Sequence, residues 1–243
     1  MSATPPRNLQ RPLQSAAGAW LHNPVTGELS RINVAPAETG GRWIETDLWL
    51  QPGAAVAAPH VHDNLEERFE VVEGKVAFMV GGAERELEAG DEPVTVPAGV
   101  AHDWWNGGES VAHARVRVQA LPGAAGEPAA RFVSMIEAVW SLGALGRVNA
   151  AGMPGPLWLA AIAHEYRDAI RFLKPPRAVQ SALFGPLSAL ARRTGRDPLA
   201  AELHGPAAAC AIPAPDEARF RELISRPVGA RAADRRLEPR PAG

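Results

Sequence analysis

The stretch His60–Gly74, HVHDNLEERFEVVEG, places two histidines one residue apart and carboxylates a few positions further on. Successive side chains of an extended strand alternate between two faces, so His60 and His62 point the same way and can share one ion. Glu67 begins the apolar face of the strand that follows, whereas Glu66 falls on its charged face. These residues predict a metal site in which Glu67, the inward carboxylate, is a ligand.

A third histidine, His102, follows a second turn signal, Pro97-Ala98-Gly99. It reaches the same ion only if strands distant in the sequence come together, as they do in a β-barrel. Imidazole and carboxylate ligands suit Fe(II), Mn, Ni, Co, Cu or Zn, and ligand type alone does not choose among these metals. The sequence therefore predicts one divalent transition metal and leaves its identity open.

Two groups of residues resemble the signature motifs of the cupin superfamily. The first group is Gly53, His60, His62, Glu67 and Gly74, and the second is Gly90, Pro97, Gly99, His102 and Asn106. The spacings that follow Gly53 and Gly90 are each one residue longer than the family pattern, and this departure falls in turns. The resemblance implies a mainly β fold, a double-stranded β-helix or jelly-roll barrel, with one metal ion held by His60, His62, Glu67 and His102.

Short strands separated by Gly and Pro turns support a barrel over residues 15–121 independently of these motifs. The pattern predicts hairpins over 20–34 and 71–80, a strand over 42–50, an exposed edge strand over 84–88 and a half-buried closing strand over 111–121.

The composition changes after the barrel. Residues 122–130, PGAAGEPAA, are typical of a linker, and beyond them the apolar period changes from two to about 3.6. A helical extension is expected over 131–204, with helices from Phe132 to about Gly143 or Gly146, from Pro156 to Leu173, and from Ala178 to Arg193 with a bend or break at Gly185-Pro186. A flexible N-terminal arm, 1–14, and a mobile Pro/Ala/Arg-rich tail, 205–243, complete the expected organisation.

The apolar faces of these helices can pack on the barrel, on each other, on a second subunit or on a membrane surface. Arg and Lys flank the apolar positions, as in interfacial helices, but Glu165 and Asp168 interrupt the basic face. We favour protein packing, with the extension as a lid or dimer interface, and expect a homodimer.

Charge and hydropathy exclude several classes of protein. A net charge of −2 gives no support to nucleic-acid binding, which requires a basic surplus. The longest apolar run, 155–163, is far shorter than the roughly 20 residues of a membrane span. Cys210 is the only cysteine, and Pro and Arg occupy the N-terminal positions where a secretory signal has its apolar core. We expect a cytoplasmic protein.

Three residues are candidates for substrate binding. Trp104 has the parity of His102 and offers an aromatic wall beside the metal, or else packs in the core. Trp49 is a second aromatic candidate. Arg117 shares a strand face with two other basic side chains, and binds an anionic substrate only if that face lines the cavity rather than facing water. The isolated histidines His22, His164 and His204 are interpreted as surface or helix residues.

A metal held by three histidines and one carboxylate keeps positions open for substrate or O2. The leading hypothesis is a non-haem metal dioxygenase or other oxidoreductase, with Fe(II) favoured, that acts on a small enol or catechol-like substrate through Glu67 and the metal. Two alternatives remain. One is a non-redox isomerase, cyclase or lyase, and the other is a barrel that binds or senses a small molecule without turnover.

Overall fold

The computed structural model describes residues 14–56, 58–225 and 228, so most of the expected N-terminal arm and the end of the expected tail lie outside the described residues. The strands before the helices are β1 Trp20–Asn23, β2 Glu28–Val34, β3 Trp43–Leu50, β4 His60–Val61, β5 Leu65–Glu73, β6 Lys75–Val80, β7 Ala83–Glu88, β8 Val94–Val96, β9 His102–Asn106 and β10 Ala112–Ala120. The later elements are α1 Pro128–Ala144, α2 Pro156–Glu165, β11 Arg171–Phe172, α3 Arg177–Arg193, β12 Ala211–Ile212 and α4 Glu217–Ser225, with short 3-10 turns at Pro36–Thr39, Ala201–Leu203 and Gly205–Ala207.

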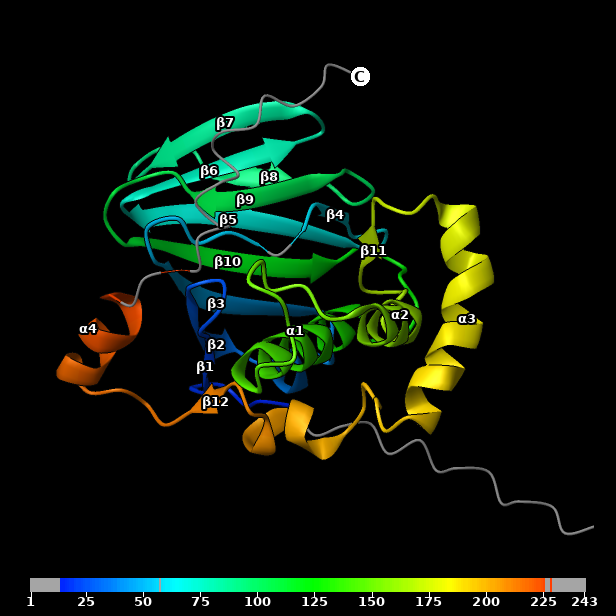
Figure 1. Ribbon diagram of the computed structural model, residues 1–243. Coiled ribbons are helices and arrows are strands. Elements are labelled where there is room, and N and C mark those ends of the chain that lie inside the picture. Colours follow the sequence, from blue (N-terminus) through cyan, green and yellow to red (C-terminus); the bar gives the residue numbers. More distant parts are fainter. Residues whose placement is uncertain (1–13, 57, 226–227, 229–243) are drawn as a thin grey trace, which may run out of the picture.

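Two antiparallel sheets face each other and form a jelly-roll barrel, which confirms the mainly β fold expected from the sequence (Figure 1). One sheet has the strand order β12-β1-β2-β3-β10-β5-β8, and the other has the order β11-β4-β9-β6-β7. The expected hairpin over 20–34 is present as the β1–β2 pair, and the expected edge strand is β7. Sequence-distant strands β4 and β9 are neighbours, with His60 opposite His102.

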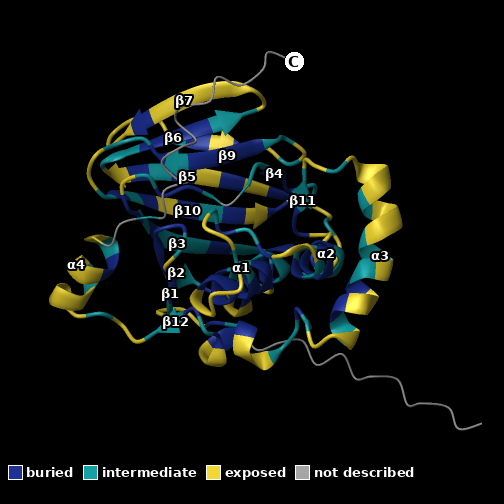
Figure 2. Cartoon of the chain, viewed as in Figure 1, coloured by how far each residue is buried: buried dark blue, intermediate teal, exposed yellow. Residues whose placement is uncertain are grey.

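The core lies between the sheets and beneath α1. Side chains of β10 alternate between buried and more exposed positions, as a strand with one face on a core requires. The same apolar cluster includes Phe69 and Phe78 from the two sheets and Val133 and Trp140 from α1. Figure 2 shows α1 and α2 largely buried and α3 largely exposed. α1 therefore completes the barrel core, whereas Trp158 and Ile162 of α2 pack with α1 in a second apolar cluster.

The second helix is shorter than the sequence indicated. We expected a helix from Pro156 to Leu173, but α2 ends at Glu165. The backbone N–H groups of Ala169 and Ile170 both bond the Tyr166 carbonyl, which closes the helix end. Arg171 and Phe172 then pair as β11 with β4. A two-residue strand carries no periodicity that sequence reading can detect.

The described part of the expected tail packs on the barrel. β12 pairs with β1, and the side chains of Cys210 and Leu223 are each 1% exposed. Phe220 of α4 meets the Trp49 ring edge-on, with the ring centroids 5.2 Å apart. Residues 205–225 thus differ from the mobile tail that their composition indicated, because Cys210 lies in the apolar cluster beside α1 and Phe220 packs on the outer face of the larger sheet.

The segment 71–80 is not the tight hairpin that the sequence indicated. β5 pairs with β10 and β8, whereas β6 pairs with β7 and β9, so the chain passes from one sheet to the other at Gly74. Gly74 has a φ of 72°. A Cβ built there would lie 2.7 Å from the Val111 carbonyl oxygen and 2.9 Å from the Ala112 Cα. Glycine is required at this corner for both reasons.

Gly74→Ala is therefore expected to lower the free energy of unfolding by more than the roughly 1–2 kcal/mol that a left-handed backbone alone costs. Gly82→Ala is the matched control, because Gly82 has a φ of 88° and nothing within 4 Å of a built Cβ. Urea unfolding of both variants measures the difference. Equal losses would show that the close approach at Gly74 has no energetic effect.

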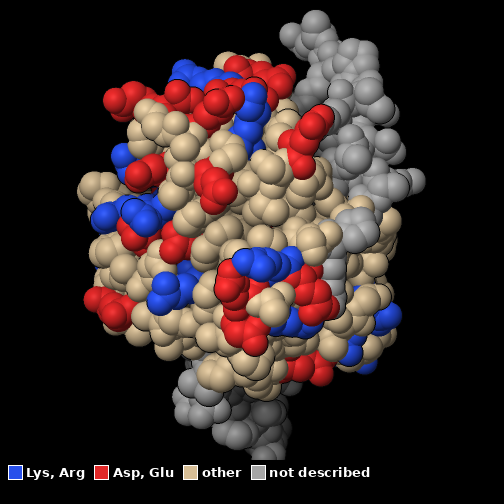
Figure 3. Space-filling view, turned by 90° about the vertical axis from the view of Figure 1, so that its left-hand side faces the viewer, with Lys and Arg blue, Asp and Glu red and all other residues tan. Residues whose placement is uncertain are grey.

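Charged side chains are mixed in sign on the face shown in Figure 3, where acidic and basic groups lie side by side. Ion pairs such as Lys75–Glu88, between β6 and β7, and Arg219–Glu222, within α4, join surface charges of opposite sign. Within the described residues no helix is both long enough and apolar enough to cross a membrane.

Candidate metal centre

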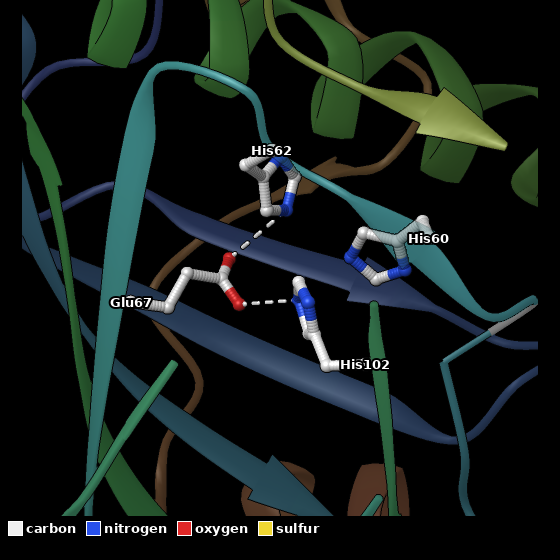
Figure 4. A group of neighbouring side chains, drawn as sticks. All are labelled: His60, His62, Glu67 and His102. Carbon is white, nitrogen blue, oxygen red and sulfur yellow. Dashed lines mark hydrogen bonds and ion pairs between the residues drawn. The ribbon is translucent and has the colours of Figure 1, made fainter. Parts of the chain in front are cut away.

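Four buried side chains meet inside the barrel mouth: His60 and His62 from the β4 segment, Glu67 from β5 and His102 from β9. Each is at most 5% exposed. One donor atom of each lies within 4.8 Å of the others, close enough to share one ion. Figure 4 shows the rings and the carboxylate turned toward one another. The structure brings together the four residues that the sequence nominated as ligands.

The three imidazole rings are fixed by backbone carbonyls. Nδ1 of His60 lies 2.9 Å from the Ala58 oxygen, and Nδ1 of His102 lies 3.0 Å from the Val100 oxygen. Nδ1 of His62 is hydrogen-bonded to the Ala169 oxygen. A carbonyl only accepts, so each Nδ1 carries the proton and each Nε2 presents its remaining valence to the centre. Metal-binding histidines are commonly oriented in this way.

The carboxylate faces two of these nitrogens. Glu67 Oε1 lies 3.4 Å from Nε2 of His62, and Glu67 Oε2 lies 3.0 Å from Nε2 of His102 (Figure 4). In neutral rings these nitrogens are acceptors, and acceptors at such distances repel one another unless a proton or cation lies between them. Nε2 of His62 is buried and has no hydrogen-bond partner among the described residues. The donor set fits a divalent cation.

Burial and neighbouring charge set the protonation of the site. Burial lowers the pKa of His60 to about 3, and His62 and His102 reinforce the shift, so this ring is neutral at neutral pH. Burial alone would raise the pKa of Glu67, but His62 and His102 outweigh it and hold that pKa well below its usual value. Burial opposes charge on His102, yet its hydrogen bond to Glu67 raises its pKa. The carboxylate is therefore ionised and ready to bind a cation.

Comparison with known proteins agrees with this arrangement. A family model described as a cupin domain matches residues 48–116, a range that contains all four side chains. The barrel of this chain therefore contains a cupin domain. A search of curated proteins finds no match.

Solved structures similar to this cupin cover only part of it. The cupin domain of Schizosaccharomyces pombe Cnp3 is 13% identical over 39% of this chain and 66% of that one, with a TM-score of 0.35. A predicted oxalate decarboxylase from Thermotoga maritima is 19% identical over 39% and 81%, with a TM-score of 0.37. A protein from Thermus thermophilus is 30% identical over 33% and 74%, with a TM-score of 0.31. The family assignment rests on the family model and the site residues.

Residues after the barrel complete the cupin site. The carbonyl that holds His62 belongs to Ala169, in the connection between α2 and β11. Phe132 of α1 meets the His62 ring edge-on, with the centroids 5.3 Å apart. Arg171 pairs with Asp63 at 2.9 Å and ties β11 to the residue next to His62. Sequence reading missed these contacts because nothing in the helical pattern points to the barrel mouth.

A cavity of about 140 Å³ opens beside the four side chains and is bordered by His60 and Glu67. Its other walls are mainly apolar side chains from the inner face of the larger sheet and from α1 and α2. Trp104 lies in this wall at 8% exposure and also packs against Phe69, with ring centroids 6.4 Å apart. Trp104 is placed to contact a bound molecule, as the sequence indicated, and it is also part of the core.

The other two substrate candidates lie elsewhere. Trp49 stacks between Trp20 and His113 on the outer face of the larger sheet, with centroids 5.2 and 4.7 Å away. The Arg117 guanidinium lies 4.0 Å from the Trp43 ring centroid on that same outer face. The alternation that turns Ile44 and Val118 into the cavity turns these residues away from it. We therefore withdraw both from the substrate site.

Two histidines interpreted as surface or helix residues are buried. His22 is 8% exposed, and His204 is 3% exposed beside Glu137, with Nδ1 3.6 Å from Oε2. Neither borders the cavity or the metal centre.

Sequence reading also missed a carboxyl group, Glu28, which lines the same cavity. It is 3% exposed and receives hydrogen bonds from Asn23 and Thr26. Burial raises its pKa to about 7, although both hydrogen bonds act in the opposite direction. The sequence pattern that could have identified Glu28 is a pair of polar residues, Asn23 and Glu28, placed symmetrically about the expected hairpin turn.

Glu28→Gln is expected to change how stability depends on pH. A carboxyl whose folded pKa is raised contributes stability below its unfolded pKa, near 4.5, and loses it as the pH rises through about 7. Glutamine does not titrate, so the variant does not lose stability in this way. Its free energy of unfolding relative to that of wild type should therefore rise by about 2 kcal/mol between pH 5 and pH 8. Urea unfolding at both pH values measures it, with the exposed Glu66→Gln as control. A pH-independent difference would contradict the assignment.

Proposed function

We propose that this cupin is a metal-dependent enzyme that acts on a small, largely apolar organic molecule, most simply as a non-haem metal dioxygenase or related oxidoreductase. The observation that carries the proposal is the position of the four ligands at one end of a mainly apolar cavity. Metal, substrate pocket and aromatic wall are then contiguous. The resident cofactor is one divalent transition metal, and Fe(II) is favoured.

Each residue of the centre has a role that follows from its position. His60, His62 and His102 would hold the metal through Nε2, because each Nδ1 is engaged by a carbonyl. Glu67 would supply the anionic oxygen and balance part of the metal charge. When bound, Fe(II) or a similar ion supplies Lewis-acid chemistry and one-electron redox chemistry with O2.

Apolar and aromatic side chains enclose the metal centre and shape the cavity beside it. Phe132 covers the His62 ring, and Trp104 and Phe69 form an aromatic wall of the cavity. Excluding water strengthens electrostatic interactions at the metal and protects reactive species from hydrolysis or proton leakage. A planar enol or catechol-like substrate matches an aromatic wall beside a Lewis acid.

The cavity argues against strongly anionic substrates. None of the described residues that line it is Lys or Arg. A phosphate or dicarboxylate ligand needs cationic or multiple N–H partners to offset its desolvation. Oxalate and sugar phosphates, which the names of some similar structures mention, therefore suit this pocket poorly.

Metal analysis and oxygen uptake test the proposal. Purified full-length protein is reconstituted anaerobically with Fe(II), Mn(II), Ni(II) or Zn(II), dialysed, and analysed for metal per chain. Oxygen consumption is then followed with a panel of apolar enols, catechols and 1,3-diketones. We expect about one metal per chain and substrate-dependent oxygen uptake with Fe(II).

The alternatives give different results. Turnover of an enol or diketone without oxygen uptake would favour the isomerase or cyclase function. Stoichiometric metal and tight binding without any turnover would favour a binding protein. Failure to hold a stoichiometric metal after reconstitution would exclude both enzyme proposals.

We also keep the homodimer as a proposal. Val179, Leu183 and Leu190 of α3 are each at least 38% exposed, which leaves apolar surface on that helix. Sedimentation of the wild-type protein and of Leu183→Glu tests whether this face joins two copies.

A further inference from the structure

One oxygen of Glu28 points to a second polar site in the cavity. Asn23 Nδ2 donates to Glu28 Oε2 at 3.1 Å, and the Thr26 hydroxyl donates to the same oxygen. No hydrogen bond from the described residues reaches Oε1. The side chain is nevertheless 3% exposed and borders the cavity. An acceptor that borders a mainly apolar cavity is costly to leave without a donor, unless a bound molecule or water satisfies it.

The site lies at the end of the cavity away from the metal centre. Phe132 contacts His62 at one end of α1, and Trp140 borders the cavity two turns later. Eight residues of α-helix span about 12 Å. At the C-terminal end of α1, a Cβ on Gly143 would lie 2.8 Å from Asn23 Oδ1, so this end of the helix reaches the β1–β2 turn that holds Glu28.

The walls between the two ends are mainly apolar. Ile32, Ile44 and Leu48 line the sheet side, and Ile136 and Val139 line the helix side. Ser30 and Thr46 also border the cavity, but a molecule that fills this space contacts mainly apolar side chains along its length. The strand register also places the two carboxylates at opposite ends of β3. Glu67 lies opposite Val118, which in turn lies opposite Ile44 near the start of β3, whereas Glu28 lies opposite Leu50 at the end of β3.

We propose that Glu28 Oε1 accepts a hydrogen bond from a hydroxyl group at one end of an elongated apolar substrate, and that the other end of this substrate lies at His60 and Glu67. The proposal deepens the proposed function and rests on it only for the identification of the ligand as a substrate. It adds the substrate class, an apolar alcohol or phenol, and a residue that selects it.

Fixed neighbours give the site its preference. Asn23 Oδ1 accepts from the Val25 backbone N–H, which orients its amide so that Nδ2 donates to Glu28. Oε2 is therefore occupied, and only Oε1 is presented to a ligand. A ligand carboxylate at this point would be repelled by Glu28, and a plain hydrocarbon would leave Oε1 unsatisfied. A neutral O–H donor satisfies it without bringing a second charge into the cavity.

Calorimetric titration of the full-length protein with 2-naphthol and naphthalene at pH 8 tests this preference. The two probes share an apolar frame and differ by one hydroxyl group. We expect wild type to bind 2-naphthol about tenfold more tightly, the effect of one hydrogen bond to a charged acceptor. The titrations are done with metal-free and Zn(II)-loaded protein. Because the preference is read without turnover and in both forms, its failure is distinguishable from failure of the proposed enzyme function.

Two substitutions locate the preference. In Glu28→Gln the amide oxygen remains with the Asn23 and Thr26 donors, so an N–H group replaces the acceptor that faces the cavity. In Glu28→Met no polar atom remains. Both variants should bind 2-naphthol about tenfold more weakly and naphthalene within about threefold of wild type, and Glu66→Gln should match wild type for both probes.

Three results would overturn the proposal: no preference for 2-naphthol in wild type, a preference that survives in both Glu28 variants, or an equal loss in Glu66→Gln. Survival in the Glu28 variants would place the hydroxyl at the metal end instead. Unchanged naphthalene binding shows that the cavity of each variant is intact, and Glu28→Gln, the closest in shape, keeps the test available if Glu28→Met does not fold.

Discussion

Replacing His62 with alanine is expected to remove stoichiometric metal from the protein and to abolish any metal-dependent activity. Nε2 of His62 is buried, faces Glu67 at 3.4 Å and has no hydrogen-bond partner among the described residues. Losing an outer-shell partner already costs roughly 10- to 100-fold in metal affinity, and losing a ligand should cost more. Metal per chain after reconstitution and dialysis measures the effect, together with oxygen uptake.

The matched control is Glu66→Ala. Glu66 neighbours Glu67 in sequence but lies exposed on the opposite face of β5, whereas Glu67 is 4% exposed and points into the centre. Glu66→Ala should retain metal and activity, and Glu67→Ala should lose both. Equal metal loss in Glu66→Ala and Glu67→Ala would show that the wrong carboxylate has been assigned, and thermal unfolding of each variant separates metal loss from misfolding.

The ligand cluster could be predicted because strand parity groups His60 with His62 and turns Glu67 inward, and because the resemblance to the cupin motifs adds His102. A period of two puts His60 and His62 on the same face of their strand and puts Glu66 and Glu67 on opposite faces of theirs. Both placements hold in the structure. The barrel could be predicted because Gly- and Pro-bearing turns recur between short strands. The same parity argument, applied to β3 and β10, already separated Trp49 and Arg117 from the inward side chains of their strands. The choice of Trp49 and Arg117 as substrate-binding candidates was inconsistent with this parity.

Other features depend on long-range packing that sequence patterns do not record. The Gly74 turn looks the same whether two strands pair as a hairpin or pass between sheets, and only the partners of β5 and β6 decide. The end of α2 at Glu165 depends on how residues 166–170 leave the helix and lead into β11, which pairs with β4. In the sequence Glu28 resembles an ordinary hairpin residue, and only the fold shows that it is buried and borders the cavity.

Trp140→Ala is expected to destabilise the barrel and the helices together. Trp140 lies in α1, is 6% exposed and belongs to the same apolar cluster as Leu21, Ile44 and Phe69 of the barrel. Truncating a buried Trp typically costs about 3–5 kcal/mol. Because α1 covers the inner face of β1, β3 and β10, we propose that the barrel and α1 unfold as one unit. Urea unfolding followed by far-UV circular dichroism should show one transition at lower urea.

Leu145→Ala provides the control, because Leu145 directly follows α1 at 38% exposure and its loss should change stability by no more than about 0.5 kcal/mol. Metal release, followed in the same titrations, reports the barrel site directly. If the helices formed an independent domain, Trp140→Ala would produce two transitions, with metal retained through the first. A single transition that coincides with metal release would mean that the residues after 127 are needed to hold the site, as expected if the Ala169 carbonyl and Phe132 fix the His62 ring.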